Sequence, residues 1–181
     1  MKRMFTPEEF EKEWLKNADA QTKSKFIKQY KNIYRFWIDD LKKQLSNYTP
    51  PFEDLTMRRA VSPSFNYQEQ DLAGEIWKRF PLDRRYLVSN FGRIKFLGII
   101  QKQKDEKTGY VTLADENLNK DYVYNLVAYT FLDKIYCDGY HVHHITNDGY
   151  YNTVENLVLL TQAEHSYVHG FEIGGGKYGS N

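Results

Sequence analysis

The chain has 181 residues, of which 41% are hydrophobic and 27% are charged, so it can bury a core and is not disordered throughout. Its single cysteine excludes an internal disulfide and a cysteine-based zinc ribbon. No apolar run reaches the ~20 residues of a transmembrane helix, and the first residues lack the apolar core of a signal peptide. We therefore expect a soluble, cytoplasmic protein with no membrane partner.

The net charge of +1 is unevenly distributed along the chain. Residues 1–48 carry +4 and residues 75–122 carry +3, whereas residues 49–74 carry −2 and residues 123–181 carry −4. The nearly neutral total argues against a general polycation, but the two basic segments still permit local contacts with phosphates.

The N-terminal part of the chain predicts helices. Residues 6–9 combine a capping threonine, a proline at the first helical position and acidic residues in the first turn. From Phe26 to Leu45, apolar residues recur in steps of three and four, which describes one amphipathic helix. We expect residues 1–48 to form a helical extension whose lysines face solvent. Contact of these lysines with DNA or a protein partner is the alternative.

Short elements follow this extension. Residues 49–74 have three prolines and little periodicity, and they predict a linker with a short helix. From residue 75 the pattern changes to strands and turns, with a strand, a glycine turn and a strand in residues 86–95. The remaining elements are a strand in residues 109–113, an antiparallel return in 120–124, a buried helix in 126–132 and a flexible tail in 171–181.

All of the histidines lie near the C-terminal end of the chain. Residues 140–145 predict a strand, on which alternation places His141 and His143 on one face and His144 on the other. A turn in residues 147–149 and a second strand in residues 156–160 follow.

A helix with two histidines comes next. Thr161 and Glu164 have the spacing of a capping box, and the helix that they open carries His165 and His169 one turn apart before Gly170 stops it. Two imidazoles one turn apart and a third from an adjacent strand can bind one divalent ion, for which neutral imidazole is a good ligand. Three protein ligands leave positions open, as catalytic metal sites do.

The remaining histidines have different expected roles. His144 faces away from the other rings, so an imidazole that titrates near neutral pH is available beside the metal as a general base. His141 is expected to be an ordinary core or surface histidine.

The succession of His143, His144, Asn156, His165 and His169 resembles the HNH (ββα-metal) nuclease motif, in the variant similar to colicin-type DNases. Residues 154–165 look more like phage and intron homing endonucleases. Residues 75–94 resemble the nuclease-associated modular domain that precedes HNH modules in those enzymes, and residues 124–131 fit the helix before the module. The resemblance covers residues 75–170.

Together with the patterns above, the resemblance implies an α+β chain with five parts. These are a helical N-terminal extension (1–48), a linker (49–74), a modular DNA-binding segment (75–108), an HNH nuclease module (109–170) and a flexible tail (171–181). It also implies a metal-dependent endonuclease of a bacterial or phage-infected cell. The enzyme would cleave double-stranded DNA to 5′-phosphate and 3′-hydroxyl ends, and no protein partner is evident.

The resemblance also assigns roles to individual residues. His144 takes the position of the general base, and Asn156 the position that braces the loop and orients the base. His143, His165 and His169 take the positions of ligands to one divalent ion. Zinc, nickel, manganese and magnesium are the candidates, and the histidines favour the first three over magnesium.

Five residues of the modular segment are predicted to contact DNA, most strongly Arg93 and Lys95; the others are Arg84, Arg85 and Asn90. An ordinary solvated surface is the alternative for them. For the whole chain, the alternatives are a non-enzymatic DNA-binding module with a structural metal and a less specific nuclease.

Overall fold

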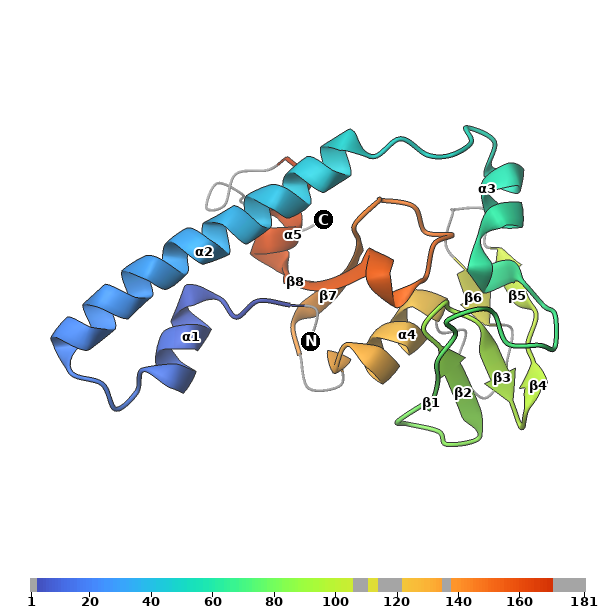
Figure 1. Ribbon diagram of the computed structural model, residues 1–181, viewed down its shortest axis with the longest axis horizontal. Helices are drawn as coiled ribbons and strands as arrows, with labels where there is room; N and C mark the ends of the chain where they lie inside the picture. The colour runs from blue at the N-terminus through green and yellow to red at the C-terminus, as the bar shows by residue number, and fades with distance from the viewer. Residues whose placement is uncertain (1–2, 106–110, 114–121, 135–137, 171–181) are drawn as a thin grey trace, which may run out of the picture.

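The computed structural model describes residues 3–105, 111–113, 122–134 and 138–170. The predictions for residues 109–110, 120–121 and the tail fall outside this part of the chain. The described part is an α+β fold, in which helices and small antiparallel sheets alternate along the chain (Figure 1). The predicted fold class is confirmed.

The N-terminal extension consists of two helices. Helix α1 (Pro7–Trp14) begins with the predicted capping box, because Thr6 Oγ1 accepts from Glu9 N at 3.2 Å and Glu9 Oε2 accepts from Thr6 N at 2.8 Å. Helix α2 (Ala20–Asn47) follows as one long helix, and α1 lies folded back beside it (Figure 1).

One face of α2 packs on the C-terminal part of the chain. Its two buried residues, Ile38 and Leu41, form a core cluster with Val158, Leu160 and Val168. Burial of this apolar stripe holds the helix on the later elements, as expected for an amphipathic helix.

The segment after α2 is packed against distant parts of the chain. It contains helix α3 (Leu55–Val61), which is the predicted short helix, and the 3-10 turn η1 (Pro63–Phe65). Ser62 Oγ donates to the carbonyl oxygen of Tyr150 at 2.6 Å, and Ser64 Oγ donates to that of Phe91 at 3.0 Å.

The β-rich segment forms two sheets. The first is antiparallel with its strands in chain order: β1 (Trp77–Arg79), β2 (Tyr86–Ser89), β3 (Ile94–Phe96) and β4 (Ile99–Ile100). Pairing of β2 with β3 confirms the strand, glycine turn and strand that the sequence predicts there. The second sheet pairs β5 (Gln103–Asp105) with β6 (Val111–Leu113).

Helix α4 (Val123–Phe131) confirms the predicted buried helix but begins earlier than expected. The strand pattern placed Val123 and Tyr124 in a return strand, which is wrong, whereas the helix that the resemblance placed over residues 124–131 is confirmed. Val123 is fully buried together with Leu126 and Val127, so the three-and-four spacing that packs α4 on the core already starts at Val123.

The C-terminal unit has the order strand, strand, helix. Strand β7 (Tyr140–His144) pairs antiparallel with β8 (Leu157–Thr161), after the short turn η4 (Val154–Asn156). Helix α5 (Gln162–Val168) begins at the predicted capping box, in which Glu164 Oε2 accepts from Thr161 N at 2.5 Å.

A single core joins the first sheet, α4 and the C-terminal unit. Its buried members are Phe80, Tyr86, Val88, Ile94, Val123, Leu126, Val127, Ala128, Leu132, Tyr150, Leu157 and Leu159. The β-rich segment and the histidine-bearing unit therefore fold on each other.

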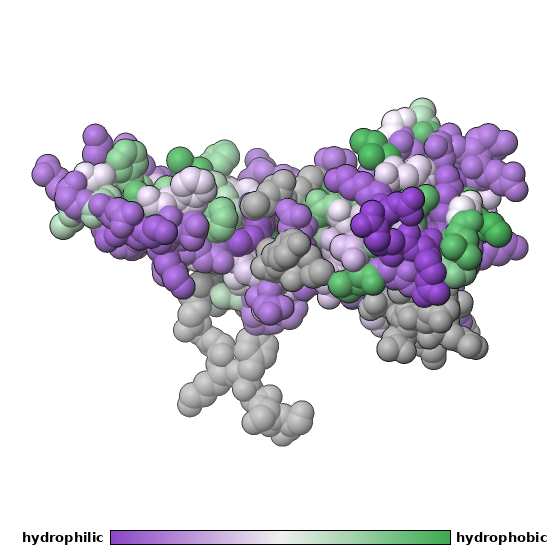
Figure 2. All heavy atoms as spheres, turned by 90° about the horizontal axis from the view of Figure 1, so that it is seen from below, coloured by the Kyte–Doolittle hydropathy of each residue, from purple (hydrophilic) through white to green (hydrophobic). Residues whose placement is uncertain are grey.

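The surface is mixed in character. On the face shown in Figure 2, hydrophobic residues form separate patches among hydrophilic ones. Among the described helices, none combines the length and the apolar composition that crossing a bilayer requires.

The turn between β2 and β3 approaches the C-terminal unit closely. Gly92 has φ +78°, and a Cβ there would lie 2.5 Å from Ser64 Oγ and 2.8 Å from the carbonyl oxygen of Asn152. Gly98, in the neighbouring turn, has φ +89°, but a Cβ there would meet nothing within 4 Å in the described part of the chain.

These two glycines form a matched pair for mutation. Gly98→Ala is expected to lower the free energy of unfolding by about 1–2 kcal/mol, which is the cost of a left-handed backbone with a Cβ. Gly92→Ala adds overpacking and is expected to cost about 2–4 kcal/mol. Urea unfolding of both variants measures the difference, and equal losses would show that the close approach at Gly92 is unimportant.

Candidate metal centre

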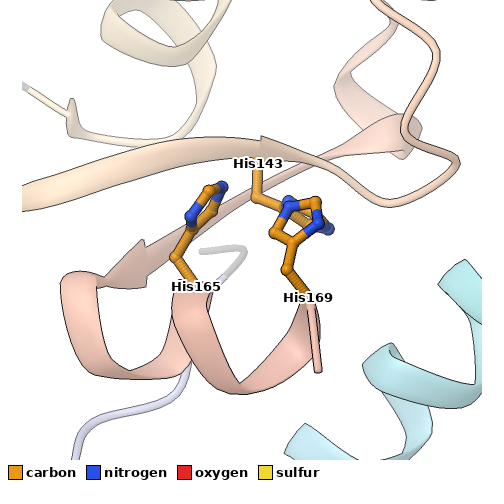
Figure 3. A group of neighbouring side chains, drawn as sticks. All are labelled: His143, His165 and His169. Atoms are coloured by element: carbon orange, nitrogen blue, oxygen red, sulfur yellow. The ribbon is translucent and has the colours of Figure 1, made fainter. Parts of the chain in front are cut away.

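Three imidazoles converge between β7 and α5. His143 points from the strand toward the helix, and His165 and His169 point back toward it from the last turns of α5 and its C-cap (Figure 3). The ring centroids of His143 lie 5.2 Å from His165 and 5.0 Å from His169, and those of His165 and His169 are 4.6 Å apart. One ring nitrogen from each residue lies within 4.8 Å of the others. The predicted convergence is confirmed, and the role of the three rings as ligands remains a prediction.

The environment of His143 fits a metal ligand. The residue is 3% exposed, and in the described part of the chain its buried Nε2 has no hydrogen-bond partner. A buried polar atom without a partner is costly, and a cation shared with His165 and His169 would satisfy it.

Two of the three rings, those of His143 and His165, are held in the neutral form. Burial, followed by repulsion from His165 and His169, lowers the pKa of His143 to about 3. Burial, followed by repulsion from His169 and His141, also lowers the pKa of His165. Neutral imidazole is the form that binds metal ions, so these two rings need not release a proton to do so near pH 7.

His144 lies beside this cluster in a protected position. It is 6% exposed and lines the same pocket of about 500 Å³ as the three converging histidines. Its ring meets that of Tyr124 edge-on, with centroids 5.3 Å apart. Burial lowers the pKa of His144, although the hydrogen bond with Asn152 and the charge of Asp148 oppose this shift.

Asn152 makes a buried contact with the ring of His144. Its Oδ1 lies 2.9 Å from His144 Nε2, and the asparagine is fully buried. With the amide oxygen facing the ring, Nε2 is the donor and Nδ1 is the accepting nitrogen. The sequence gives no sign of this role, since Asn152 stands in a polar loop between two strands.

Asn156 ties together the two ends of that loop. Its Oδ1 accepts from Thr146 N at 3.1 Å, and its Nδ2 donates to the carbonyl oxygen of Tyr151 at 2.8 Å. Its own carbonyl oxygen accepts from Ile145 N at 2.8 Å. These contacts are those of a residue that braces the loop, and a contribution of Asn156 to catalysis remains a prediction.

The loop is also held from the upstream segments. Asp148, 3% exposed, accepts at Oδ1 from Tyr150 N at 3.1 Å, and its Oδ2 lies 3.7 Å from Arg58 Nη1 of α3. Val154 N donates to the carbonyl oxygen of Asn90 in the β2–β3 turn at 2.8 Å. The surroundings of His144 are therefore assembled from three separate parts of the chain.

Two of the predicted DNA contacts lie on the surface. Arg84 and Arg85 are exposed and line a concave surface together with Arg79. Arg85 forms an ion pair with Asp83 at 2.6 Å.

Two other residues that were predicted to contact DNA, Lys95 and Asn90, have partners within the protein. Lys95 Nζ donates to Asp71 at 2.9 Å and lies 4.0 Å from the centroid of the Trp77 ring. Asn90 Oδ1 accepts from Ile76 N at 2.7 Å, so this side chain joins the turn to the start of β1.

Arg93 is placed differently from the sequence expectation. Its side chain is fully buried, as is that of Glu75, and its Nη1 lies 2.7 Å from Glu75 Oε2. Nη1 also donates to the carbonyl oxygen of Gln70 at 3.2 Å, and Nη2 donates to that of Gln68. A guanidinium enclosed in this way is unavailable to DNA, which corrects the predicted contact. The physical reason is that a buried carboxylate and two carbonyl oxygens compensate its desolvation.

Comparisons with known proteins give one partial likeness. No protein-family model matches the chain, and no curated protein sequence matches it. Among solved structures, a chain from "DNA binding and cleavage by the HNH homing endonuclease I-HmuI" is similar at 26% sequence identity and a TM-score of 0.42. The likeness covers 52% of this chain and 59% of that one.

Proposed function

We propose that this protein is a metal-dependent endonuclease that hydrolyses phosphodiester bonds in double-stranded DNA. One arrangement carries the proposal: the nitrogens of His143, His165 and His169 converge within 4.8 Å, and His144 lines the same pocket. Three ligands leave open positions for substrate, and a purely structural site has no need of a fourth buried imidazole.

The three converging histidines would hold one divalent ion. When bound, the ion would stabilise the negative charge that develops on the phosphate and on the leaving 3′-oxygen. The imidazole ligands favour zinc, nickel or manganese over magnesium, which prefers oxygen ligands.

His144 would act as the general base. Its neutral ring can accept a proton from a water molecule at Nδ1, because Nε2 already donates to Asn152. The water oxygen then attacks phosphorus in line with the bond to the 3′-oxygen. As the new phosphorus–oxygen bond forms, the bond from phosphorus to the 3′-oxygen breaks, so the phosphate stays on the 5′ end, and the 3′-oxygen takes a proton from solvent to become a hydroxyl. Asn156 would keep the loop in place during this step.

The surface around Arg84 and Arg85 would contact the DNA backbone. Both arginines are exposed and share a concave surface with Arg79, so phosphates can reach them. Lys95 would contact DNA only by exchanging its partner Asp71 for a phosphate. The side chains of Asn90 and Arg93 bond to other residues of the protein and are not proposed to contact DNA.

A cleavage experiment tests the proposed function. Protein stripped of metal by a chelator is incubated with supercoiled plasmid and then with zinc, nickel, manganese or magnesium in turn. We expect nicked or linear DNA with at least one ion and none with chelator, and sequencing of the ends should find 5′-phosphates. Metal-dependent folding and DNA binding without cleavage in any ion would instead favour the non-enzymatic module.

The metal site has its own prediction. Zinc at about 100 times its dissociation constant is expected to stabilise the wild type by about 2.7 kcal/mol, which raises its melting temperature. His165→Ala removes one of three ligands and should abolish this rise. His141→Ala is the matched control, because His141 is exposed and its ring centroid lies 5.9 Å from that of His165, outside the convergent set. A normal zinc response in His165→Ala would rule out the proposed site.

A further inference from the structure

A partly buried polar contact joins the N-terminal extension to the helix that bears the candidate ligands. Glu164 is 2% exposed and stands directly before His165 in the chain. Its Oε2 accepts from Thr161 N at 2.5 Å in the capping box of α5. Its Oε1 accepts a hydrogen bond from the hydroxyl of Tyr34, which belongs to α2.

The direction of this hydrogen bond follows from its surroundings. Burial, and then the hydrogen bond and charge of Glu164, raise the pKa of Tyr34, so its phenol stays protonated and donates. Hydrogen bonds to a carboxylate are stronger than those between neutral groups. One carboxylate oxygen of Glu164 thus accepts a hydrogen bond at the start of α5, and the other accepts one from the middle of α2.

Further contacts hold α5 on α2. The Tyr167 hydroxyl donates to Asp39 Oδ1 at 2.5 Å, and Lys42 Nζ lies 4.4 Å from the centroid of the Tyr167 ring. Val168 is buried in the cluster that contains Ile38. Helix α5 has seven residues, and helices this short are marginal in water without tertiary support.

The extension also contacts strand β7, which carries His143. Tyr140 lies opposite Thr161 in the register of β7 and β8. Its hydroxyl donates to Glu9 Oε1 at 2.7 Å and accepts from Arg3 Nη1 at 2.8 Å. Both elements that carry the converging histidines are therefore fastened to residues of the N-terminal helices.

We propose that the N-terminal extension positions the metal ligands, with Tyr34 as the main positioning residue. Acting through Glu164, Tyr34 fixes the first turn of α5, so that His165 and His169 face His143. Without the hydroxyl, a buried oxygen of Glu164 loses its donor, and the carboxylate must move out of the cap to be solvated. The proposal rests on the metal site of the proposed function.

Metal affinity tests this proposal without reference to cleavage. Tyr34→Phe is compared with Tyr30→Phe, which removes a hydroxyl from the same helix; Tyr30 donates to the carbonyl oxygen of Phe5 at 2.8 Å, within the extension. The readouts are the dissociation constant for cobalt, from its visible absorption bands, and that for zinc, from calorimetry. Tyr34→Phe is expected to weaken both about 10-fold, the low end of the range for loss of contacts that orient metal ligands, whereas Tyr30→Phe should leave them within about 2-fold.

The melting temperature of the chelated protein separates positioning from simple stabilisation. A Tyr34→Phe variant with a lower melting temperature but wild-type metal affinity would overturn the proposal and leave the metal site intact. A wild type that binds neither ion would overturn the metal site and this proposal together. If Tyr34→Phe does not fold, Tyr167→Phe tests the same interface through the contact with Asp39, with an expected loss of affinity of about 3-fold, and an unchanged affinity would count against the proposal.

Discussion

His144→Ala should reduce the rate of DNA cleavage by about 10²- to 10⁴-fold, which is the usual contribution of a general base. The substitution removes the ring that would accept the proton of the attacking water. Because the proposed ligand nitrogens belong to His143, His165 and His169, metal affinity should stay within a few-fold of the wild type.

Single-turnover cleavage with saturating protein and metal isolates the chemical step. Calorimetry with zinc and a binding assay in chelator show whether the variant still binds metal and DNA. His141→Ala serves as the control, since it removes an exposed imidazole from the same strand. Cleavage by His144→Ala at the wild-type rate would exclude the proposed mechanism, whereas loss of metal binding would indicate that His144 is needed for the site itself.

Arg93→Met is expected to lower the free energy of unfolding by about 3–5 kcal/mol, because it leaves a buried carboxylate without its counter-ion. The side chains of Arg93 and Glu75 are both fully buried, and methionine occupies similar space without the charge. Arg84→Met, at an exposed position near the same sheet, should change stability by less than about 0.5 kcal/mol.

A second substitution separates the ion pair from general damage to the core. In the double variant Arg93→Met/Glu75→Leu the unpaired charge is gone, so most of the lost stability should return. Urea unfolding of the single and double variants gives both free energies. If Arg93→Met were as stable as the wild type and bound DNA more weakly, the surface role predicted from the sequence would have to be restored.

The sequence predicts the local features of this protein well. Both capping boxes form as expected, at Thr6 and at Thr161, because each depends on residues three positions apart. The convergence of the histidines was also predictable, since a one-turn spacing in α5 and alternation in β7 leave few other arrangements.

What the sequence does not predict depends on contacts between distant segments. A basic residue after a glycine turn has the same local pattern whether it faces DNA or, like Arg93, a buried carboxylate 18 residues away. The partnership of Asn152 with His144 depends on the path of a loop, and that of Tyr34 with Glu164 on the docking of a long helix. None of these contacts leaves a periodic signal in the chain.

The contact between Tyr34 and Glu164 joins residues 130 positions apart, which matters for how the protein is made. On the ribosome, α2 emerges long before its packing partners Val158, Leu160 and Val168 have been synthesised. The apolar stripe of α2 is therefore exposed to water during synthesis. The histidine cluster can assemble only after nearly all of the described part of the chain has left the ribosome. If the chain is the nuclease proposed above, nascent chains and chains truncated before the last histidine would not cleave the DNA of the cell that translates them.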